Sequence, residues 1–388
     1  MAERGSVAEV FLAFLRLGLT SFGGPVAHLG YFRADLVQRR RWIGEEGFAD
    51  LVALCQFLPG PASSQVGFAL GLMRAGPLGG LAAWAGFTLP SAILLVAFAR
   101  GAPLIAGATG QAVLHGLKLA AVAVVAQAVW GMARSLAPDR PRAAIALAAG
   151  GLMAAGGPAV LQIAAIALGA AAGLALCRAA GPVPAGHLPQ PVGRAAGIAC
   201  LAVFTALLLA ALSGGGGGLW PLFAAFYRSG ALVFGGGHVV LPLLQASVVA
   251  PGWVSPCDFL AGYGAAQAVP GPLFTFAAYL GAVAGPGLSG AAVALAGIFL
   301  PGLLLVAGVL PFWDGLRLGP RLRAAMRGAN AAVVGLLAAA LYDPVWTSAI
   351  HRPVDVALAA TGLVALVQWK APPWAVVALA ALAGLLTA

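Results

Sequence analysis

Hydrogen-bond donors follow two short motifs that interrupt apolar segments of the chain. The motifs are Pro59-Gly60-Pro61 and Pro270-Gly271-Pro272. A helix that begins after such a break presents free backbone N–H groups and the positive end of its dipole. Side-chain donors follow each motif: Ser63, Ser64 and Gln65 after the first, and Thr275 after the second. These donors suit a tetrahedral dianion with many acceptor lone pairs, and their unequal number predicts an asymmetric site. A plain hairpin turn is the alternative for each motif.

Paired glycines form a second candidate element, Gly23 with Gly24 and Gly235 with Gly236. Glycine lets the backbone approach a ligand closely, and it equally lets two hairpin tips pack tightly against each other. His238 follows the second pair and could carry a proton or pair with an anion. Hydrogen bonding to neighbouring groups is the ordinary alternative for this histidine.

Three basic residues, Arg16, Arg228 and Lys118, lie inside apolar stretches. Charges in such positions are costly, and they are usually functional or paired. Arg16 and Arg228 occupy equivalent positions of an internal repeat, which favours a shared role near the path of an anion. Snorkelling of the long side chains to a membrane interface is the alternative. Lys118 aligns with Asn330 in that repeat, and we expect it to attract anions.

Other kinds of chemistry have no motif in this sequence. The four cysteines form no Cys-x-x-Cys pair, so we expect neither a metal site nor a disulfide framework. Nucleophile, Walker and dinucleotide motifs are missing as well, so we expect no enzyme activity, no cofactor and no ATP hydrolysis. The acids Glu45, Glu46 and Asp50 stand at the start of an apolar run, as helix-capping residues do.

The composition requires lipid as a solvent for most of the chain. Of the 388 residues, 61% are hydrophobic and 8% are charged, whereas a soluble domain carries about 25% charged residues. The formal net charge of +10 comes from basic residues between apolar segments, as in cytoplasmic loops. We therefore expect a lipid bilayer and an anionic cargo as partners, and no nucleic acid. The N-terminal residues lack the features of a signal peptide.

Apolar stretches long enough to span a bilayer are separated by interrupted ones. The candidate spans are 79–99, 113–133, 142–157, 158–177, 196–212, 288–311, 329–349, 354–369 and 373–388. The interrupted stretches are 7–32, 47–75, 219–250 and 258–286, each cut by Gly or Pro. Because Pro removes a backbone donor and Gly loosens a helix, these four predict broken helices or re-entrant hairpins.

The two halves of the chain repeat each other. Residues 14–24 (FLRLGLTSFGG) match residues 226–236 (FYRSGALVFGG), and Gln56 with its Pro-Gly-Pro matches Gln267 with its own. Gly86 and Pro90 then match Gly297 and Pro301. A duplication predicts a first membrane repeat at 1–177, a linker and extra helix at 178–216, and a second membrane repeat at 217–388.

Charge predicts that the repeats are inverted in the membrane. The loop after the first FGG holds Arg33, Arg39, Arg40 and Arg41, whereas its counterpart at about 245–257 holds no Lys or Arg. The bias reverses after residues 79–99, where only Arg100 stands, against four arginines at about 312–327. Equivalent loops should thus lie on opposite faces. The expected fold is an all-α, polytopic integral membrane protein of two inverted-topology repeats with broken or re-entrant helices.

Five stretches together resemble the chromate ion transporter family in its long, two-domain form. They are FLRLGLTSFGGPVAHLGYF, QFLPGPASSQ, FGGGHVVLPLL, QAVPGPLFTF and GANAAVVGLLAAALYDPVW, and they extend over nearly the whole chain. FGG and PGP each occur twice and in order, which makes the resemblance specific. It implies active extrusion of chromate, chromate resistance, and sulfate as a structural analogue.

Inverted repeats with interrupted helices are typical of secondary transporters with a site near the bilayer midplane. The expected function is secondary active transport of a tetrahedral oxyanion, most plainly chromate efflux. An anion channel, or an uptake protein for sulfate or another oxyanion, is the alternative. The expected location is the cell inner membrane, with a homodimer as a possible assembly.

The charge pattern yields a test of topology. We expect the N-terminus and the linker near Arg194 on the cytoplasmic side and the C-terminus near Ala388 outside. Reporter fusions or cysteine accessibility at residues 36 and 250 should place these two positions on opposite faces. Finding both on one face would exclude the inverted arrangement.

Overall fold

The computed structural model describes residues 5–22, 24–101, 107–154, 160–177, 188, 190–233, 237–316 and 320–387, and these are helical or irregular with no β-strand. The helices of the first half are α1 (Val7–Thr20), α2 (Gly24–Phe32), α3 (Glu45–Phe57), α4 (Ala62–Gly101), α5 (Ala108–Leu136), α6 (Arg140–Ala154) and α7 (Val160–Leu176). A connecting helix, α8 (Arg194–Leu212), precedes the second half. The helices of the second half are α9 (Trp220–Ala231), α10 (Val240–Leu244), α11 (Pro256–Ala268), α12 (Phe276–Ala284), α13 (Leu288–Val309), α14 (Trp313–Leu316), α15 (Pro320–Ala340), α16 (Thr347–Ala349), α17 (Pro353–Val367) and α18 (Pro373–Thr387).

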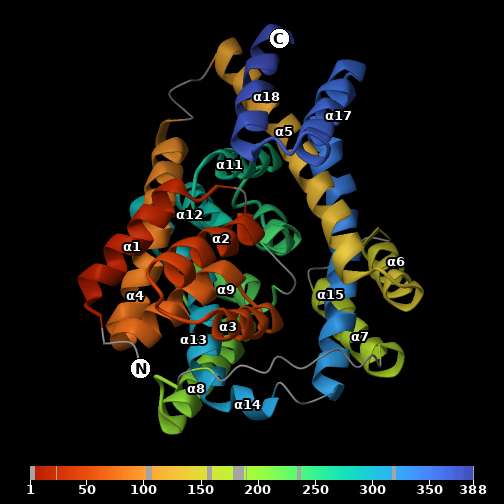
Figure 1. The fold of residues 1–388 in the computed structure, drawn as a ribbon. Coiled ribbons are helices and arrows are strands. Elements are labelled where there is room, and N and C mark those ends of the chain that lie inside the picture. Colours follow the sequence, from red (N-terminus) through yellow and green to blue (C-terminus); the bar gives the residue numbers. More distant parts are fainter. Residues whose placement is uncertain are drawn as a thin grey trace.

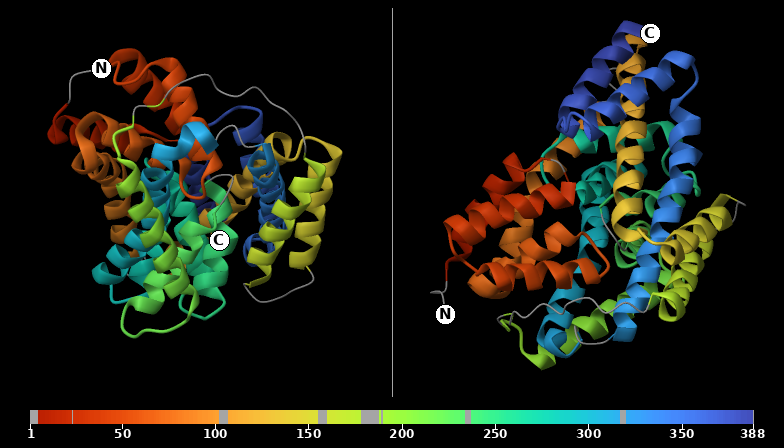
Figure 2. Two further views of the ribbon diagram at one scale, coloured as in Figure 1. Left: turned by 90° about the horizontal axis from the view of Figure 1, so that it is seen from below. Right: turned by 45° about the vertical axis from the view of Figure 1, so that its right-hand side comes forward.

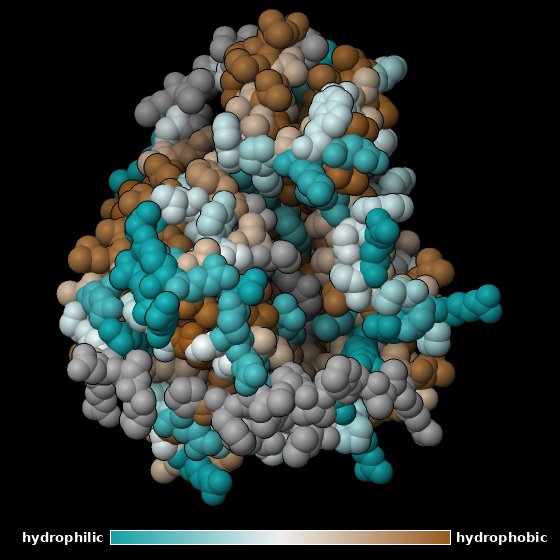
Figure 3. All heavy atoms as spheres, in the orientation of Figure 1, coloured by the Kyte–Doolittle hydropathy of each residue, from teal (hydrophilic) through white to brown (hydrophobic). Residues whose placement is uncertain are grey.

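The helices are those of a multi-pass membrane protein. Five of them in the described residues are long and apolar enough to cross a membrane: Ala62–Gly101, Gly110–Leu136, Arg194–Leu212, Leu288–Phe312 and Arg323–Ala349. Large apolar side chains such as Leu147, Leu168 and Leu386 are exposed, as expected of a surface that faces lipid. Figure 3 shows apolar side chains over α18 and polar ones gathered over the segment between α2 and α3. The predicted all-α membrane fold is thus confirmed.

Four of the candidate spans form short helices over the described residues. The helices α6, α7, α17 and α18 hold 15, 17, 15 and 15 residues. At 1.5 Å per residue they are about 22–26 Å long, whereas the hydrocarbon core is about 30 Å thick. In sequence order they form two pairs, α6 with α7 and α17 with α18, one pair at the end of each half.

Each of the four interrupted stretches contains a break between two helices. The chain leaves helical geometry between α1 and α2, between α3 and α4, between α9 and α10, and between α11 and α12. These positions carry the Phe-Gly-Gly and Pro-Gly-Pro motifs in alternation. Broken helices are therefore present where the sequence predicts them.

The long helix α4 turns back on itself. Ala75 and Gly76 have non-helical dihedral angles, and Gly76 has φ +70°, in the left-handed region that glycine tolerates. A side chain on Gly71 would overlap the backbone of Gly79, which shows that the two limbs pack directly together. The second half builds the same hairpin from α12 and α13, joined at Gly287 with φ +64°.

The short helix pairs are exchanged between the halves. In Figures 1 and 2, α6 and α7 lie beside α15, and α17 and α18 lie beside α5. Equivalent glycines make these contacts: Gly116 of α5 lies against Ala380 of α18, and Gly328 of α15 lies against Gly169 of α7. Each half thus packs against the terminal helix pair of the other half. The predicted division into two repeats with a linker at 178–216 stays a prediction about the sequence.

The structure also refines where the topology test should be made. Leu36 is fully buried inside a π-helical turn, Arg33–Arg39, so a cysteine there would be unreactive on either face. Gln38 lies on the same turn and is exposed, as is Ala250 in the equivalent segment. Cysteines at 38 and 250 are the better pair of reporters.

The exchanged contacts predict a large effect from one small side chain. A Cβ at position 116 would overlap the carbonyl oxygen of Ala380, so Gly116→Ala must push α18 away from α5. We expect it to lower the free energy of unfolding by about 1–3 kcal/mol, seen as a lower melting midpoint of the purified protein.

Gly131→Ala is the matched control on the same helix. Gly131 has open space around it, so alanine should raise stability by about 0.5–1 kcal/mol through its better helix propensity. Equal melting midpoints for the two variants would contradict the close packing of α5 against α18.

Candidate functional site

Two backbone hydrogen bonds join the breaks of one half to those of the other. The amide of Gly271 donates to the carbonyl of Ser21 at 2.9 Å, and the amide of Gly60 donates to the carbonyl of Val233 at 2.8 Å. Gly60 and Gly271 are the central residues of the two Pro-Gly-Pro motifs, and Ser21 and Val233 each precede a Phe-Gly-Gly motif. The two bonds are therefore repeat-equivalent and reciprocal. We call them the Gly60 crossing and the Gly271 crossing.

Both crossings require glycine. Gly60 has φ +124° and Gly271 has φ +102°, which L side chains rarely adopt. A Cβ on Gly60 would lie 2.8 Å from Nε2 of Gln65, and one on Gly271 would lie 2.8 Å from Oγ of Ser91. The glycines thus permit the backbone angle and the close approach of the neighbouring helix.

All four breaks meet at these crossings. Besides the two hydrogen bonds, a Cβ on Gly237 would lie 3.3 Å from Pro25 and 3.6 Å from Leu273, so the third break touches the first and the fourth. Gly24 has φ +79° and open space at its Cβ position. Gly23, Gly235 and Gly236 lie outside the described residues, so their part in the site stays a prediction.

The donors after the first Pro-Gly-Pro are buried at the start of α4. Ser63, Ser64 and Gln65 are 3%, 2% and 0% exposed. Oγ of Ser63 lies 3.3 Å from Nδ1 of His28. Gln65 donates its amide hydrogens to the carbonyls of Pro59 and Gly302 at 2.9 and 3.2 Å, so this side chain ties the break to α13. Its remaining polar atom is an acceptor.

Buried polar atoms without a hydrogen-bond partner gather around the crossings. In the described part of the chain they include Oγ of Ser21 and Ser64, Oε1 of Gln65, Oγ1 of Thr88 and Nε2 of Gln267. Ser21 and Gln267 belong to the breaks themselves. Thr88 lies on α4 beside Phe87, whose carbonyl is 3.2 Å from the Cβ position of Gly271. Because buried polar groups are nearly always satisfied, such a cluster indicates a place for a polar ligand or water.

Ser21, His28, Thr88 and Gln267 are absent from the predicted site. Two of them carried a usable signal in the sequence, since Ser21 adjoins the first Phe-Gly-Gly and Gln267 stands three positions before the second Pro-Gly-Pro. Thr88 carried none, because it stands in an unbroken apolar helix and reaches the site only through the packing of α4.

The remaining predicted polar residues near the breaks already have partners. Nδ1 of His238 lies 2.6 Å from the hydroxyl of Tyr263, which is fully buried on α11. Thr275 donates to the carbonyl of Pro272 at 2.7 Å and so closes the turn that starts α12. His238 thereby links the third break to α11, and Thr275 stabilises the fourth break locally.

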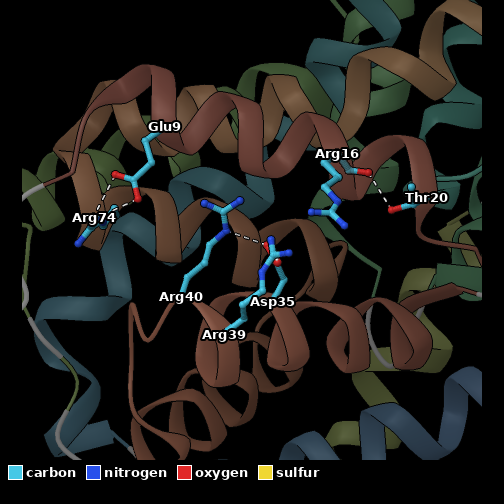
Figure 4. A network of polar contacts seen from close by, with 7 residues as sticks. All are labelled: Glu9, Arg16, Thr20, Asp35, Arg39, Arg40 and Arg74. Carbon is cyan, nitrogen blue, oxygen red and sulfur yellow. Dashed lines mark hydrogen bonds and ion pairs between the residues drawn. The ribbon is translucent and has the colours of Figure 1, made fainter.

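The three predicted basic residues occupy different surroundings. Arg16 is exposed on α1, and Figure 4 shows it pointing to the side where Arg39, Arg40 and Asp35 gather. Arg228 is half-buried and donates to the carbonyl of Ala211 at 2.6 Å, near the end of α8. A cation there satisfies a free helix-terminal carbonyl.

Lys118 lies with Nζ 3.7 Å from Sγ of Cys257, at the start of α11. The break at the other end of α11 is about 18 Å further along the helix axis. None of the three basic residues has an assigned contact with the crossings, and their role in transport stays a prediction.

Charged groups are concentrated at the surface between α2 and α3. Arg33 donates to Glu45 at 2.8 Å, and this bond holds the pKa of the Glu45 carboxyl below its usual value. Both residues line an open recess of about 620 Å³. Across the described residues, no three His, Cys, Asp or Glu side chains come together as a metal site would require.

Comparison with known proteins agrees with this architecture. The model of a family described as "Chromate transporter" matches residues 8–174 and again residues 220–385. The chain is 34% identical to the "Chromate transport protein" of Pseudomonas aeruginosa over 94% of its own length and 88% of that protein. It is 29% identical to the protein of the same name from Cupriavidus metallidurans, over 98% of this chain and 93% of that protein.

A "Probable chromate transport protein" of Synechococcus elongatus is 28% identical over 98% of this chain and 95% of that protein. No solved structure matches. One family model fits each half, which bears out the internal repeat, and the relatives are transporters and not enzymes. The chain belongs to the chromate transporter family.

Proposed function

We propose that this protein is a secondary active transporter that exports chromate across the cell membrane and so confers chromate resistance. Membership of the chromate transporter family supports chromate as the cargo. Sulfate, which has the same shape and charge, is the expected analogue. The observation that carries the mechanism is the junction of four helix breaks with unpartnered buried donors around it.

The junction offers what a transport site needs. Irregular backbone is tolerated at membrane depth only where it is buried in protein or lines a cavity, so four breaks in one place favour a ligand site. The unpartnered groups there are mainly hydroxyls and an amide, and they carry no charge. Neutral donors can hold a dianion and release it again, whereas a buried pair of cations would hold it too tightly for rapid turnover.

The reciprocal crossings supply a means of alternating access. Each crossing joins a break of one repeat to a break of the other, so a rocking of one repeat against the other must act on both. In transporters with inverted repeats, such a motion exposes a central site first to one face and then to the other.

Flux measurements in everted membrane vesicles test the function and its direction. We expect saturable chromate accumulation that requires an ion gradient, because export from a cell becomes uptake in an everted vesicle. Sulfate should compete. Linear flux that follows the chromate gradient alone would indicate a channel, and accumulation only in right-side-out vesicles would indicate uptake.

Variants of the repeat-equivalent Arg16 and Arg228 give a prediction in which the effect on chromate flux can be told apart from the effect on protein stability. Arg16→Gln and Arg228→Gln should each reduce chromate flux while the protein still inserts, because each removes a cation expected near the anion path. Arg228→Gln should also lower stability by about 1.5–3 kcal/mol, since it removes a charged donor from a helix-end carbonyl.

Arg16 is exposed, so Arg16→Gln should change stability by less than about 0.5 kcal/mol. Flux and thermal melting are measured on the same preparations. Normal flux through both single variants would reassign the two arginines to interfacial anchoring.

The serines after the first Pro-Gly-Pro give a prediction about binding. Ser63→Ala combined with Ser64→Ala should weaken oxyanion binding, because losing one hydrogen bond to a charged group costs about 1.5–3 kcal/mol, or roughly ten- to a hundredfold in affinity. Calorimetry on the purified protein with chromate and with sulfate measures this directly. Unchanged affinity in a folded double variant would place the site away from the start of α4.

A further inference from the structure

Four repeat-equivalent positions of the junction are polar in the first repeat and apolar in the second. Residues Ser21, His28, Ser63 and Thr88 of the first repeat correspond to Val233, Val240, Phe274 and Phe299 of the second. All eight side chains are buried, with at most 3% exposed. At these four positions the duplicated backbone thus carries polar side chains in the first repeat and apolar side chains in the second.

Ser21 is part of the Gly271 crossing, and Thr88, His28 and Ser63 are connected to it through neighbouring residues. Ser21 accepts the crossing hydrogen bond through its carbonyl, and its hydroxyl is fully buried without a partner in the described part of the chain. Thr88 is likewise fully buried and unpartnered. Ser91, one turn further along α4, donates to the carbonyl of Thr88 at 3.1 Å and lies against Gly271.

His28 joins Ser63 to this group. Its ring packs edge-on against Phe87, the residue before Thr88, with centroids 5.2 Å apart, and Nδ1 lies 3.3 Å from Oγ of Ser63. A neutral imidazole and a hydroxyl have two donor hydrogens between them, and their mutual hydrogen bond uses one. In the tautomer that carries its proton on Nδ1, the Ser63 hydroxyl remains available to a ligand.

Among the described residues, the second repeat places apolar side chains at the equivalent positions of the Gly60 crossing. Val233 and Phe299 stand where Ser21 and Thr88 stand, and Gln65 closes this crossing with two hydrogen bonds to Pro59 and Gly302. Gln56, the counterpart of Gln267, is exposed. At the Gly60 crossing both amide hydrogens of Gln65 are used and only its oxygen, an acceptor, is left without a partner, whereas the Gly271 crossing holds spare donors.

We infer that the protein has a single oxyanion site, at the Gly271 crossing, in which Ser21, Thr88 and the Ser63–His28 pair donate to the oxyanion. This inference rests on the proposed transport function and assigns its ligands. The hydroxyls of Ser21 and Thr88 are the new members. Their donors match a fully deprotonated tetrahedral oxyanion, which presents only acceptors. One molecule should bind one ion, although the fold has two equivalent crossings.

Deletion of a buried hydroxyl that binds the ligand and deletion of one that is only unsatisfied differ in their effect on binding. A buried hydroxyl without a partner destabilises the folded protein, so replacing it by an apolar group of similar shape should raise the melting midpoint of the ligand-free protein. If the hydroxyl also binds the oxyanion, the same change must weaken binding. Greater stability with weaker binding is therefore the signature of the proposed role.

The test compares Ser21→Ala combined with Thr88→Val against the wild type, using thermal melting without ligand and calorimetry with sulfate and chromate. We expect a higher melting midpoint, at least about tenfold weaker binding of both ions, and a stoichiometry of one in the wild type. Thr88→Ser, which keeps the hydroxyl, should retain most of the affinity and covers the case in which the double variant does not fold.

Ser229→Ala is the matched control in the second repeat. Ser229 is as buried as Ser21, but it donates to the carbonyl of Ala225 at 2.9 Å and lies 3.1 Å from Oγ of Ser247. Its loss should lower the melting midpoint and leave oxyanion affinity unchanged.

Wild-type affinity in a folded double variant would overturn the assignment of Ser21 and Thr88, and so would a stoichiometry of two. Failure of folded wild-type protein to bind either ion would instead count against the proposed function itself. The two failures are thereby distinguished.

Discussion

Every break of a helix inside an apolar segment frees backbone N–H and C=O groups that lipid cannot satisfy, and each such group left alone costs several kcal/mol. This protein contains four breaks and satisfies them mutually. The amide of Gly60 bonds to the carbonyl before the third break, and the amide of Gly271 bonds to the carbonyl before the first. Because each bond joins opposite repeats, neither repeat can complete its own breaks, and the junction between them becomes an obligatory part of the fold.

The terminal helix pairs of the two halves also depend on the opposite half for their packing. The short pair α6–α7 packs on α15 of the other half, and α17–α18 packs on α5. Glycines at the contacts let the backbones approach to a distance that no larger residue permits. Small residues at helix contacts are the usual means of association in lipid, where burial of apolar surface drives helices together only weakly. The exchange ties the two halves at their outer ends, as the crossings tie them at the centre.

A duplicated framework of this kind can carry a site that is not duplicated. Backbone geometry is kept in both repeats because the breaks depend on each other, but the side chains around each crossing are free to diverge. Around Gly271 the unpartnered atoms include the hydroxyls of Ser21 and Thr88, and around Gly60 the amide hydrogens of Gln65 are both used and only its oxygen is left over. Such an asymmetric junction suits the proposed carrier, because in that proposal the ion meets both faces of the membrane in turn.

The sequence by itself determined the membrane class, the internal repeat, the four breaks and the family, because these depend on local composition and on motifs that occur twice in order. It also indicated Ser63 and Ser64, which follow a break directly. It gave no sign that Gln65 ties α4 to Gly302, that the terminal helix pairs are exchanged, or that Thr88 is buried next to Phe87, whose carbonyl approaches Gly271. These features are contacts between residues far apart in the chain, such as the 237 positions between Gln65 and Gly302. Only the tertiary structure decided them, because the angle at which two helices pack settles which polar atoms find partners and which remain free for a ligand.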